Sequence, residues 1–234
     1  MLIYGMQKTT LLDYPGHVAA TLFTAGCNFR CPYCHNAELV LELTGIQRIP
    51  EEEIFGFLQK RRGILEGVCI TGGEPTLQKD LEAFIRQIKD LGFLVKLDTN
   101  GYRPEILKKL LEQDLLNYVA MDFKASKEGY AKVVGLSELE FARIAESAAL
   151  LMGQGRIPYE FRTTVVKGLH TPEEIGEIAE YLQGAEQYFL QDYRESENIL
   201  CPGAGFEAFS RQELEEMAEK ARKYIARVEV RGVE

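Results

Sequence analysis

The sequence predicts an α/β fold organised as a partial (β/α)6 barrel. Apolar, strand-like segments alternate with amphipathic, helix-like segments along most of the 234 residues, which is typical of a parallel sheet with crossover helices. Polar residues follow six of the strand-like segments, and barrels of this kind carry their chemistry at the carboxyl ends of the strands. Length and a hydrophobic content of 46% suffice for one large core. We therefore expect a single domain over residues 1–234, with a barrel core at about 17–195 and a C-terminal helix and strand at about 208–232.

The expected strands are short apolar runs that end in polar loops. Six of them make up the predicted barrel: Val18–Thr24, Gly67–Thr71, Phe93–Asp98, Tyr118–Asp122, Tyr159–Val165 and Tyr188–Asp192. A seventh strand is expected at Arg227–Arg231.

Helices are expected between these strands, where apolar residues recur at three- and four-residue spacing. The clearest example places five residues on one face, namely Leu81, Phe84, Ile85, Ile88 and Leu91. Gly92 can end that helix, and further helices fit at about Glu51–Lys60 and Arg103–Leu115. Three more should begin at capping boxes, in which a Ser or Thr precedes a Glu by three residues: Ser137 with Glu140, Thr171 with Glu174, and Ser210 with Glu213.

Bulk composition restricts the partners and the compartment. The net charge of −9 argues against non-specific nucleic-acid binding, which relies on clustered Lys and Arg. No apolar run is long enough to cross a membrane, and the N-terminus lacks the basic and apolar regions of a signal peptide. Five cysteines, three of them clustered, do not indicate a disulfide framework. We therefore expect a cytoplasmic protein without nucleic-acid or membrane partners.

The most informative motif is a cysteine loop, Cys27-x3-Cys31-x2-Cys34, which follows the first expected strand. Each iron of a four-iron cluster takes one thiolate, so three cysteines leave one iron open for another ligand. The alternative is a closed zinc site, which needs a fourth protein ligand. The local candidate is His35, but it directly follows Cys34, which makes tetrahedral geometry awkward. The spacing therefore favours a [4Fe–4S] cluster.

Other motifs lie at the ends of later strands. Gly72-Gly73-Glu74-Pro75 follows the second, where paired glycines let a ligand approach the backbone, although an ordinary turn gives the same pattern. Asp98 begins Asp-Thr-Asn-Gly, and Asp122 and Lys124 share a strand face, which also suits a plain ion pair. Arg162 is an interior charge that needs a partner, either a ligand or an acid such as Asp98 or Glu160.

With these motifs in this order, the chain resembles radical S-adenosylmethionine enzymes, and among them the activating enzymes of glycyl-radical enzymes, most closely those of anaerobic ribonucleoside-triphosphate reductase. The resemblance implies a [4Fe–4S] cluster whose open iron binds S-adenosylmethionine. Reductive cleavage would give a 5′-deoxyadenosyl radical that abstracts a hydrogen from a glycine of the partner enzyme. It also implies a flavodoxin or ferredoxin-like electron donor.

The resemblance assigns roles to individual residues. Tyr33 would pack on the adenine, and the segment of Gly72, Gly73 and Glu74 would hold the methionine amino group together with Asp98. Lys124 would lie near the cofactor carboxylate, Arg162 would touch cofactor or substrate, and Asp122 would help bind a monovalent cation. Asp13, in an Asp-Tyr-Pro-Gly turn, would contact the glycyl loop of the partner. Gln191 stands where a related enzyme has a histidine, and Cys201 and His170 remain unassigned.

Two other functions stay open. A radical enzyme acting on a small molecule or modified nucleoside, similar to carboxy-deazaguanine synthases, would share the cluster and the barrel. An iron–sulfur electron carrier would share the cysteines but would not need Gly72-Gly73-Glu74 or Lys124. We expect a macromolecular substrate, because a six-stranded barrel is open at its side and few residues remain after residue 195 to close its mouth.

Overall fold

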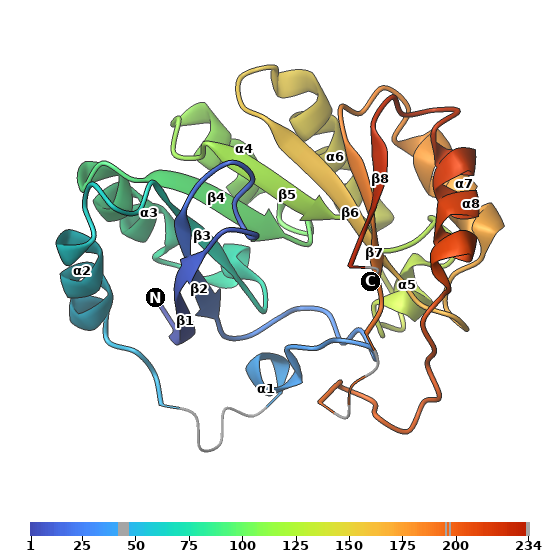
Figure 1. The fold of residues 1–234 in the computed structure, drawn as a ribbon, viewed down its shortest axis with the longest axis horizontal. Coiled ribbons are helices and arrows are strands. Elements are labelled where there is room, and N and C mark those ends of the chain that lie inside the picture. The colour runs from blue at the N-terminus through green and yellow to red at the C-terminus, as the bar shows by residue number, and fades with distance from the viewer. Residues whose placement is uncertain (42–46, 195, 197, 233–234) are drawn as a thin grey trace. The chain divides into compact units, whose positions relative to one another are not determined.

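The computed structural model describes residues 1–41, 47–194, 196 and 198–232. Figure 1 shows its elements, which in chain order are β1 (Ile3–Thr10), β2 (Ala19–Thr24), α1 (Ala37–Val40), α2 (Glu51–Lys60), β3 (Gly67–Gly72), η1 (Pro75–Leu77), α3 (Leu81–Asp90), β4 (Leu94–Thr99), α4 (Pro104–Glu112), β5 (Tyr118–Asp122), α5 (Tyr130–Val133), α6 (Phe141–Gln154), β6 (Tyr159–Val165), α7 (Pro172–Tyr181), β7 (Tyr188–Asp192), α8 (Arg211–Ala221) and β8 (Val228–Arg231). Among the described residues, no helix has both the length and the apolar character needed to cross a membrane.

The chain forms two compact units. The first comprises Met1–Asn28, Glu38–Thr99 and Arg103–Ala120, and the second comprises Phe29–Ala37, Asn100–Tyr102 and Met121–Glu234. Strand β5 begins in the first unit and ends in the second. The sheet has eight strands in chain order, from β1 to β8.

In the first unit, β1 is antiparallel to β2, whereas β2, β3 and β4 are parallel neighbours. The register aligns Thr21 of β2 with Cys69 of β3, and Cys69 with Lys96 of β4. Because side chains alternate along a strand, these three residues share one face of the sheet. Helix α3 packs on β4 and buries four of the five apolar residues that the sequence placed on its inner face: Leu81, Phe84, Ile85 and Ile88.

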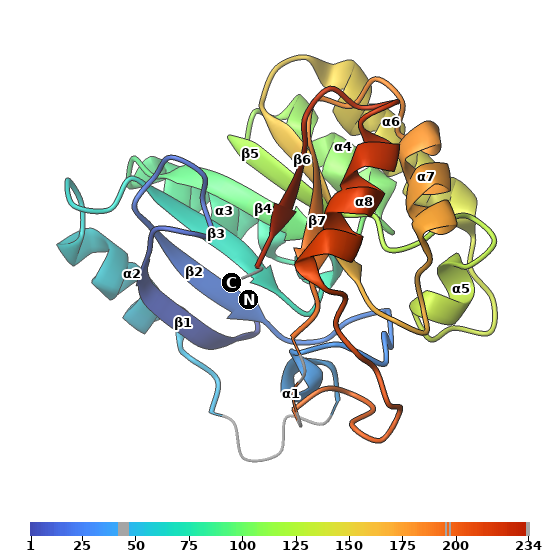
Figure 2. The ribbon, with the colours of Figure 1, turned by 45° about the vertical axis from the view of Figure 1, so that its right-hand side comes forward.

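In the second unit, β6, β7 and β8 are parallel neighbours. Figures 1 and 2 show α7 and α8 side by side next to β8, and α8 contacts both α7 and β8. Both helices begin at the predicted capping boxes: the side chains of Thr171 and Ser210 accept hydrogen bonds from the backbone of Glu174 and Glu213, whose side chains bond back to the capping residues.

The predicted α/β class is confirmed, and strands β2 to β8 begin and end within one residue of the expected positions. Strand β1 was not expected from the sequence. Residues 7–9 of this strand are all exposed, so its sequence lacks the apolar alternation by which a half-buried strand is found.

The predicted helix start at Ser137 is wrong. Helix α6 begins at Phe141, with Glu140 as its N-cap residue and no side-chain cap. The N–H of Glu140 donates to the hydroxyl of Tyr102 at 3.4 Å, and Nε of Arg143 donates to the carbonyl of Tyr102 at 3.0 Å. Contacts with Tyr102, which are distant in sequence, therefore fix this helix end in place of the capping box.

Candidate functional site

The loop after β2 carries the three predicted cluster ligands. Cys31 is buried, Cys27 and Cys34 are half-buried, and none of the five cysteines, all of which the structure describes, is in a disulfide. Cys27 belongs to the first unit, whereas Cys31 and Cys34 belong to the second. The N–H of Cys34 donates to the carbonyl of Cys31 at 3.0 Å, so these two residues lie in one tight turn.

The segment after α5 anchors the middle of the cysteine loop. The N–H of Arg30 donates to the carbonyl of Val134 at 2.8 Å. Gly135 follows with a φ of +68°, and a Cβ at this position would lie 2.2 Å from the carbonyl oxygen of Arg30. Only glycine allows this approach of two backbones, so the sequence at 134–135 determines the path of the loop just before Cys31.

The chemistry of the cysteine loop fits an iron–sulfur cluster. Burial raises the pKa of Cys31 to about 11, while the positive charge of Lys124 acts in the opposite direction. Iron binds the thiolate, so ligation of Cys31 would release a proton. Within the described ranges, no three His, Cys, Asp or Glu side chains surround a position for a single metal ion. Each iron of a four-iron cluster takes one thiolate, so three cysteines suffice when the fourth iron is left for another ligand.

The turn after β3 packs tightly against the end of β2 and the start of the cysteine loop. The N–H groups of Gly73 and Glu74 donate to the carbonyls of Thr24 and Gly26, both at 2.8 Å. Gly72 has a φ of +118°, and a Cβ on it would lie 2.3 Å from the Thr24 nitrogen. A Cβ on Gly73 would lie 2.1 Å from the Gly26 carbonyl oxygen. The paired glycines are therefore required for this backbone contact, whatever else they bind.

The side chain of Glu74 is directed inward and is only 1% exposed. Its Oε1 accepts hydrogen bonds from the backbone and hydroxyl of Thr76, at 3.1 and 2.5 Å, and from the hydroxyl of Thr99 at 2.7 Å. The carboxylate thus ties the turn after β3 to the end of β4. In the structure the side chain of Glu74 organises the backbone of the motif, and the expected contact of Gly72, Gly73 and Glu74 with the methionine amino group stays a prediction.

A buried lysine that the sequence analysis did not single out accompanies Asp98. Lys96 is 2% exposed and forms an ion pair with Oδ1 of Asp98. Its Nζ lies 3.8 Å from Sγ of Cys69 and 5.8 Å from the centroid of the Tyr118 ring. Residues two apart on a strand share a face, so a polar Lys-x-Asp pattern in an apolar strand was the available signal.

The second unit contains a chain of alternating charges along its strands. Asp122 at the end of β5 accepts from Nζ of Lys124 at 3.2 Å through Oδ2 and from Nε of Arg162 at 2.9 Å through Oδ1. Nη1 of Arg162 also lies 4.0 Å from Oε1 of Glu160. Glu160, one of the acids expected from the sequence, therefore lies near Arg162. The shorter contact of Arg162 is with Asp122, which the sequence did not predict as its partner.

This arrangement fixes the charges of Asp122 and Lys124. Burial acts to raise the pKa of Asp122, but Arg162 and Lys124 lower it to about 2. Burial acts to lower the pKa of Lys124, but Asp122 and other neighbouring groups hold it well above its usual value. Both residues are therefore ionised at neutral pH. A monovalent cation at Asp122 would share a carboxylate that already accepts from two positive groups, and that assignment stays a prediction.

The second unit contains a cavity and two buried polar atoms that have no hydrogen-bond partner among the described residues. The hydroxyl oxygen of Tyr33 is buried and has no hydrogen-bond partner among the described residues. The same holds for Oδ1 of Asp192, whose pKa is raised by burial. A cavity of about 350 Å³ is lined by seven residues, namely His35, Thr164, Gln191, Asp192, Arg194, Arg231 and Gly232. Gln191 and His35 thus line one cavity, and His35 directly follows Cys34 in the sequence.

His170, which the sequence left unassigned, joins two strand-end loops of the second unit. Its Nδ1 accepts from the N–H of Val166 at 3.1 Å, and its Nε2 bonds to the carbonyl of Lys124 at 2.8 Å. These contacts require a neutral ring with the proton on Nε2. The histidine therefore holds the backbone of Lys124 in position, a role that no local sequence signal revealed.

We expect this histidine to make stability depend on pH. Burial lowers the pKa of His170, although its bond to the Lys124 carbonyl acts to raise it. Below a pH of about 6.5 the unfolded chain binds a proton that the folded state excludes, so the free energy of unfolding should fall as pH falls. One proton corresponds to at most about 1.4 kcal/mol per pH unit.

His170→Gln tests this pH dependence. Denaturant unfolding of the protein and the variant between pH 5 and pH 8 should give a shallower slope below pH 6.5 for the variant. The same slope in both proteins would contradict the account of His170, even if the variant were less stable at every pH.

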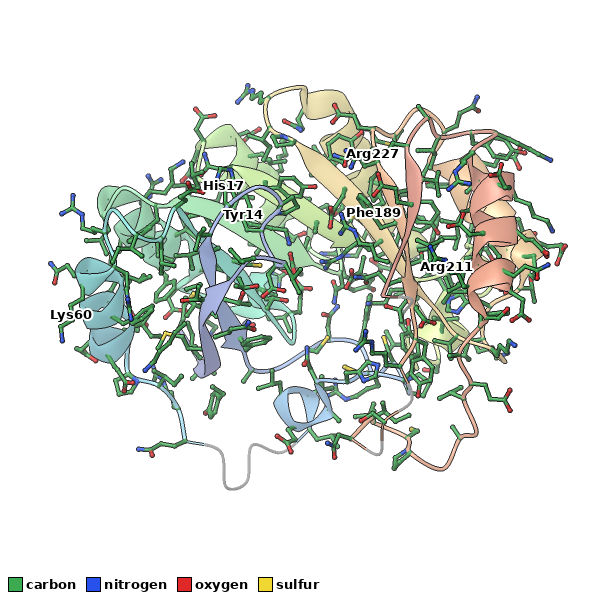
Figure 3. All side chains as sticks on the ribbon, in the orientation of Figure 1. Tyr14, His17, Lys60, Phe189, Arg211 and Arg227 are labelled. Atoms are coloured by element: carbon green, nitrogen blue, oxygen red, sulfur yellow. The ribbon has the colours of Figure 1, made fainter. Side chains whose placement is uncertain are left out.

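Asp13 lies in the loop between β1 and β2, together with Tyr14 and His17, which Figure 3 labels. Its Oδ2 accepts from the hydroxyl of Thr21 at 2.5 Å. The backbone of Asp13 precedes β2, whereas the cysteine loop follows β2, so the two lie at opposite ends of that strand. The side chain of Asp13 reaches along the strand to Thr21, on the face that carries Cys69 and Lys96.

Comparison with known proteins connects these observations to a family. The family model described as the Radical SAM superfamily matches residues 21–182. A Methanocaldococcus jannaschii protein named "Putative glycyl-radical enzyme activating enzyme" is 33% identical over 235 residues, which cover 99% of this chain and 96% of its own length. The pyruvate formate-lyase-activating enzyme of Clostridium pasteurianum is 28% identical over 145 residues, 59% of each chain. The 7-carboxy-7-deazaguanine synthase of Thermoplasma acidophilum is 36% identical over 89 residues, which cover 38% of this chain and 40% of its own length.

Solved structures agree in fold. Streptococcus suis SuiB bound to its precursor peptide SuiA superposes with a TM-score of 0.70 at 15% identity, over 90% of this chain and 48% of that chain. This chain therefore spans about half the length of SuiB. At this identity the likeness concerns the fold alone.

Proposed function

The chain belongs to the radical S-adenosylmethionine superfamily, and from this premise we propose that it is an activating enzyme that installs a glycyl radical on a partner enzyme. The observation that carries the proposal is the likeness, along 99% of this chain, to a relative named as such an activating enzyme. The match to a pyruvate formate-lyase-activating enzyme supports the same class. We propose anaerobic ribonucleoside-triphosphate reductase as the partner and a flavodoxin or ferredoxin-like protein as the electron donor.

Members of this family use a [4Fe–4S] cluster and S-adenosylmethionine. When bound, the pair supplies reductive radical chemistry that can remove a hydrogen atom from a glycine Cα. In our proposal Cys27, Cys31 and Cys34 hold the cluster. Arg30 and Gly135 fix the path of the loop before Cys31, as described above.

The remaining residues bind and orient the cofactor. The backbone of Gly72 and Gly73, held by Glu74, would accept the methionine amino group together with Asp98. The ammonium of Lys124, which stays charged, would pair with the carboxylate. The buried hydroxyl of Tyr33 would offer a polar partner to the nucleoside.

We expect Lys124→Ala to weaken binding of S-adenosylmethionine. The change removes a charged donor, worth about 1–3 kcal/mol, or roughly fivefold to 150-fold in affinity. Lys127→Ala is the matched control, because Lys127 is exposed and lies three residues further along the same loop. Anaerobic calorimetry on the reconstituted proteins measures both affinities, and equal values for the two variants would reject Lys124 as a cofactor ligand.

The small-molecule alternative rests on shorter likenesses. The match to 7-carboxy-7-deazaguanine synthase covers 38% of this chain, against 99% for the activating-enzyme relative. An experiment can distinguish a small-molecule enzyme from an activating enzyme, because the small-molecule enzyme turns over without a protein partner. An electron carrier is disfavoured by the family assignment.

Product counting separates these functions. The reduced protein is mixed anaerobically with S-adenosylmethionine and the glycyl-radical enzyme encoded in the same genome, and methionine and 5′-deoxyadenosine are measured by chromatography. We expect products in proportion to the partner added. Multiple turnovers with a purified nucleoside or metabolite, without any partner, would favour the alternative.

A further inference from the structure

The C-terminal strand contributes an arginine to the charge chain of the second unit. Arg231 of β8 forms a bidentate pair with Glu160 of β6, with Nη1–Oε1 at 3.0 Å and Nη2–Oε2 at 3.1 Å. Its guanidinium carbon lies 3.2 Å from the centroid of the Phe189 ring on β7. The match to the family model ends at residue 182, so Arg231 lies outside the part of the chain that this match covers.

Glu160 depends on this arginine. Its side chain is 1% exposed, and a carboxylate buried to this degree requires a charged partner with good geometry. Arg231 supplies two parallel hydrogen bonds, the strongest arrangement available to a carboxylate. Arg162 is a further positive neighbour, with Nη1 at 4.0 Å from Oε1 of the same group.

The charge chain therefore consists of five side chains whose signs alternate at every step, in the order Lys124, Asp122, Arg162, Glu160 and Arg231. Three cations and two carboxylates leave one positive charge in this set. That surplus within the set suits the binding of one anionic group at the Lys124 end of the charge chain. Removal of Arg231 alone would leave two cations facing two carboxylates.

We propose that Arg231 is a positioning residue for Lys124, the proposed partner of the cofactor carboxylate; this inference rests on the proposed function. Arg231 occupies Glu160 and so leaves Arg162 directed at Asp122. Without Arg231, Glu160 draws Arg162 toward itself, and Asp122 loses one of its two positive partners. Asp122 then holds Lys124 more strongly, and the ammonium is less available to a bound carboxylate.

The test measures affinity for S-adenosylmethionine by anaerobic calorimetry on the reconstituted proteins. We expect Arg231→Gln to weaken binding by about tenfold, as is typical for members of one ion-pair network. The amount of S-adenosylmethionine needed to change the electron paramagnetic resonance spectrum of the reduced cluster should rise by the same factor. Arg227→Gln is the matched control, because Arg227 pairs with the exposed Glu229 at 2.7 Å and lies further from the Phe189 ring, at 6.0 Å (Figure 3).

A double variant distinguishes positioning from a general loss of structure. Glu160→Gln with Arg231→Gln removes both the arginine and the carboxylate that competes for Arg162, so affinity should return to within about twofold of the unmodified protein. Glu160→Gln alone should bind like the unmodified protein. If Arg231→Gln does not fold, judged by thermal unfolding without cluster or cofactor, the double variant still decides the question.

Unchanged affinity in Arg231→Gln, or weak binding by a folded double variant, would overturn this role of Arg231. Both results leave the proposed function standing, provided that the unmodified protein binds S-adenosylmethionine and Lys124→Ala weakens that binding. If the unmodified protein with its full iron content binds no S-adenosylmethionine, the proposed function fails first.

Discussion

Cys31→Ala will abolish cluster assembly, and Cys27→Ala and Cys34→Ala will do the same. A three-cysteine loop has no ligand to spare, because the fourth iron already lacks a protein thiolate. Anaerobic reconstitution should load about four irons per chain into the unmodified protein and almost none into these variants. Cleavage of S-adenosylmethionine should then fall below detection. Iron content by colorimetric assay and the absorbance of the cluster measure the effect.

Cys201→Ala is the matched control for these variants. Cys201 is exposed, and its contact with the cysteine loop is a backbone hydrogen bond to the carbonyl of Pro32, at 2.9 Å, which the substitution preserves. It should keep the full iron content. One tightly bound zinc per chain in anaerobically prepared protein, without iron uptake, would show that the loop is a zinc site.

Gly73→Val will disrupt the turn that the account assigns to the methionine group. The first side-chain carbon would lie 2.1 Å from the carbonyl oxygen of Gly26, a backbone atom that cannot move without shifting the start of the cysteine loop. Overpacking of this kind costs about 1–3 kcal/mol in stability. The displaced backbone should weaken S-adenosylmethionine binding by roughly a hundredfold, or about 3 kcal/mol.

Gly153→Ala provides the comparison, because a Cβ at this exposed position of α6 meets nothing within 4 Å. It should bind the cofactor like the unmodified protein. Thermal unfolding and anaerobic calorimetry of both variants separate the loss of stability from the loss of binding. Normal affinity in a folded Gly73→Val protein would remove this turn from the cofactor site.

The sequence predicted the strands of the fold because each is marked by features within the strand itself. Apolar runs of five to seven residues, followed by polar loops, located β2 to β7 to within one residue. The prediction from sequence failed where an element is fixed by contacts with residues that are distant along the chain. Helix α6 starts at Phe141 because of contacts with Tyr102, which lies 38 residues before Glu140. Strand β1 is held by pairing with β2, and its exposed residues carry no pattern of their own.

The residues of the candidate site likewise fall into two groups, those that a local sequence pattern reveals and those whose role depends on distant partners. The cysteine spacing and the paired glycines are local patterns with a chemical reason, so they could be recognised in the sequence. The partners of the charged residues could not, because a strand sequence does not say which side chains of neighbouring strands it will meet. Arg162 bonds to Asp122 across 40 residues, and Glu160 bonds to Arg231 across 71. His170 is a further case, since its function depends on the carbonyl of Lys124, 46 residues away.

The central claim is that this protein places a radical on a glycine of another protein, and electron paramagnetic resonance of that partner tests it most directly. The reduced protein, S-adenosylmethionine and the glycyl-radical enzyme of the same genome are mixed without oxygen, and the spectrum is recorded after the activating protein has been removed. We expect a doublet from the single hydrogen left on the glycine Cα, and this doublet should collapse when the partner is made with glycine deuterated at that carbon. Cleavage of S-adenosylmethionine with no radical on the partner, or a signal that deuteration leaves unchanged, would contradict it.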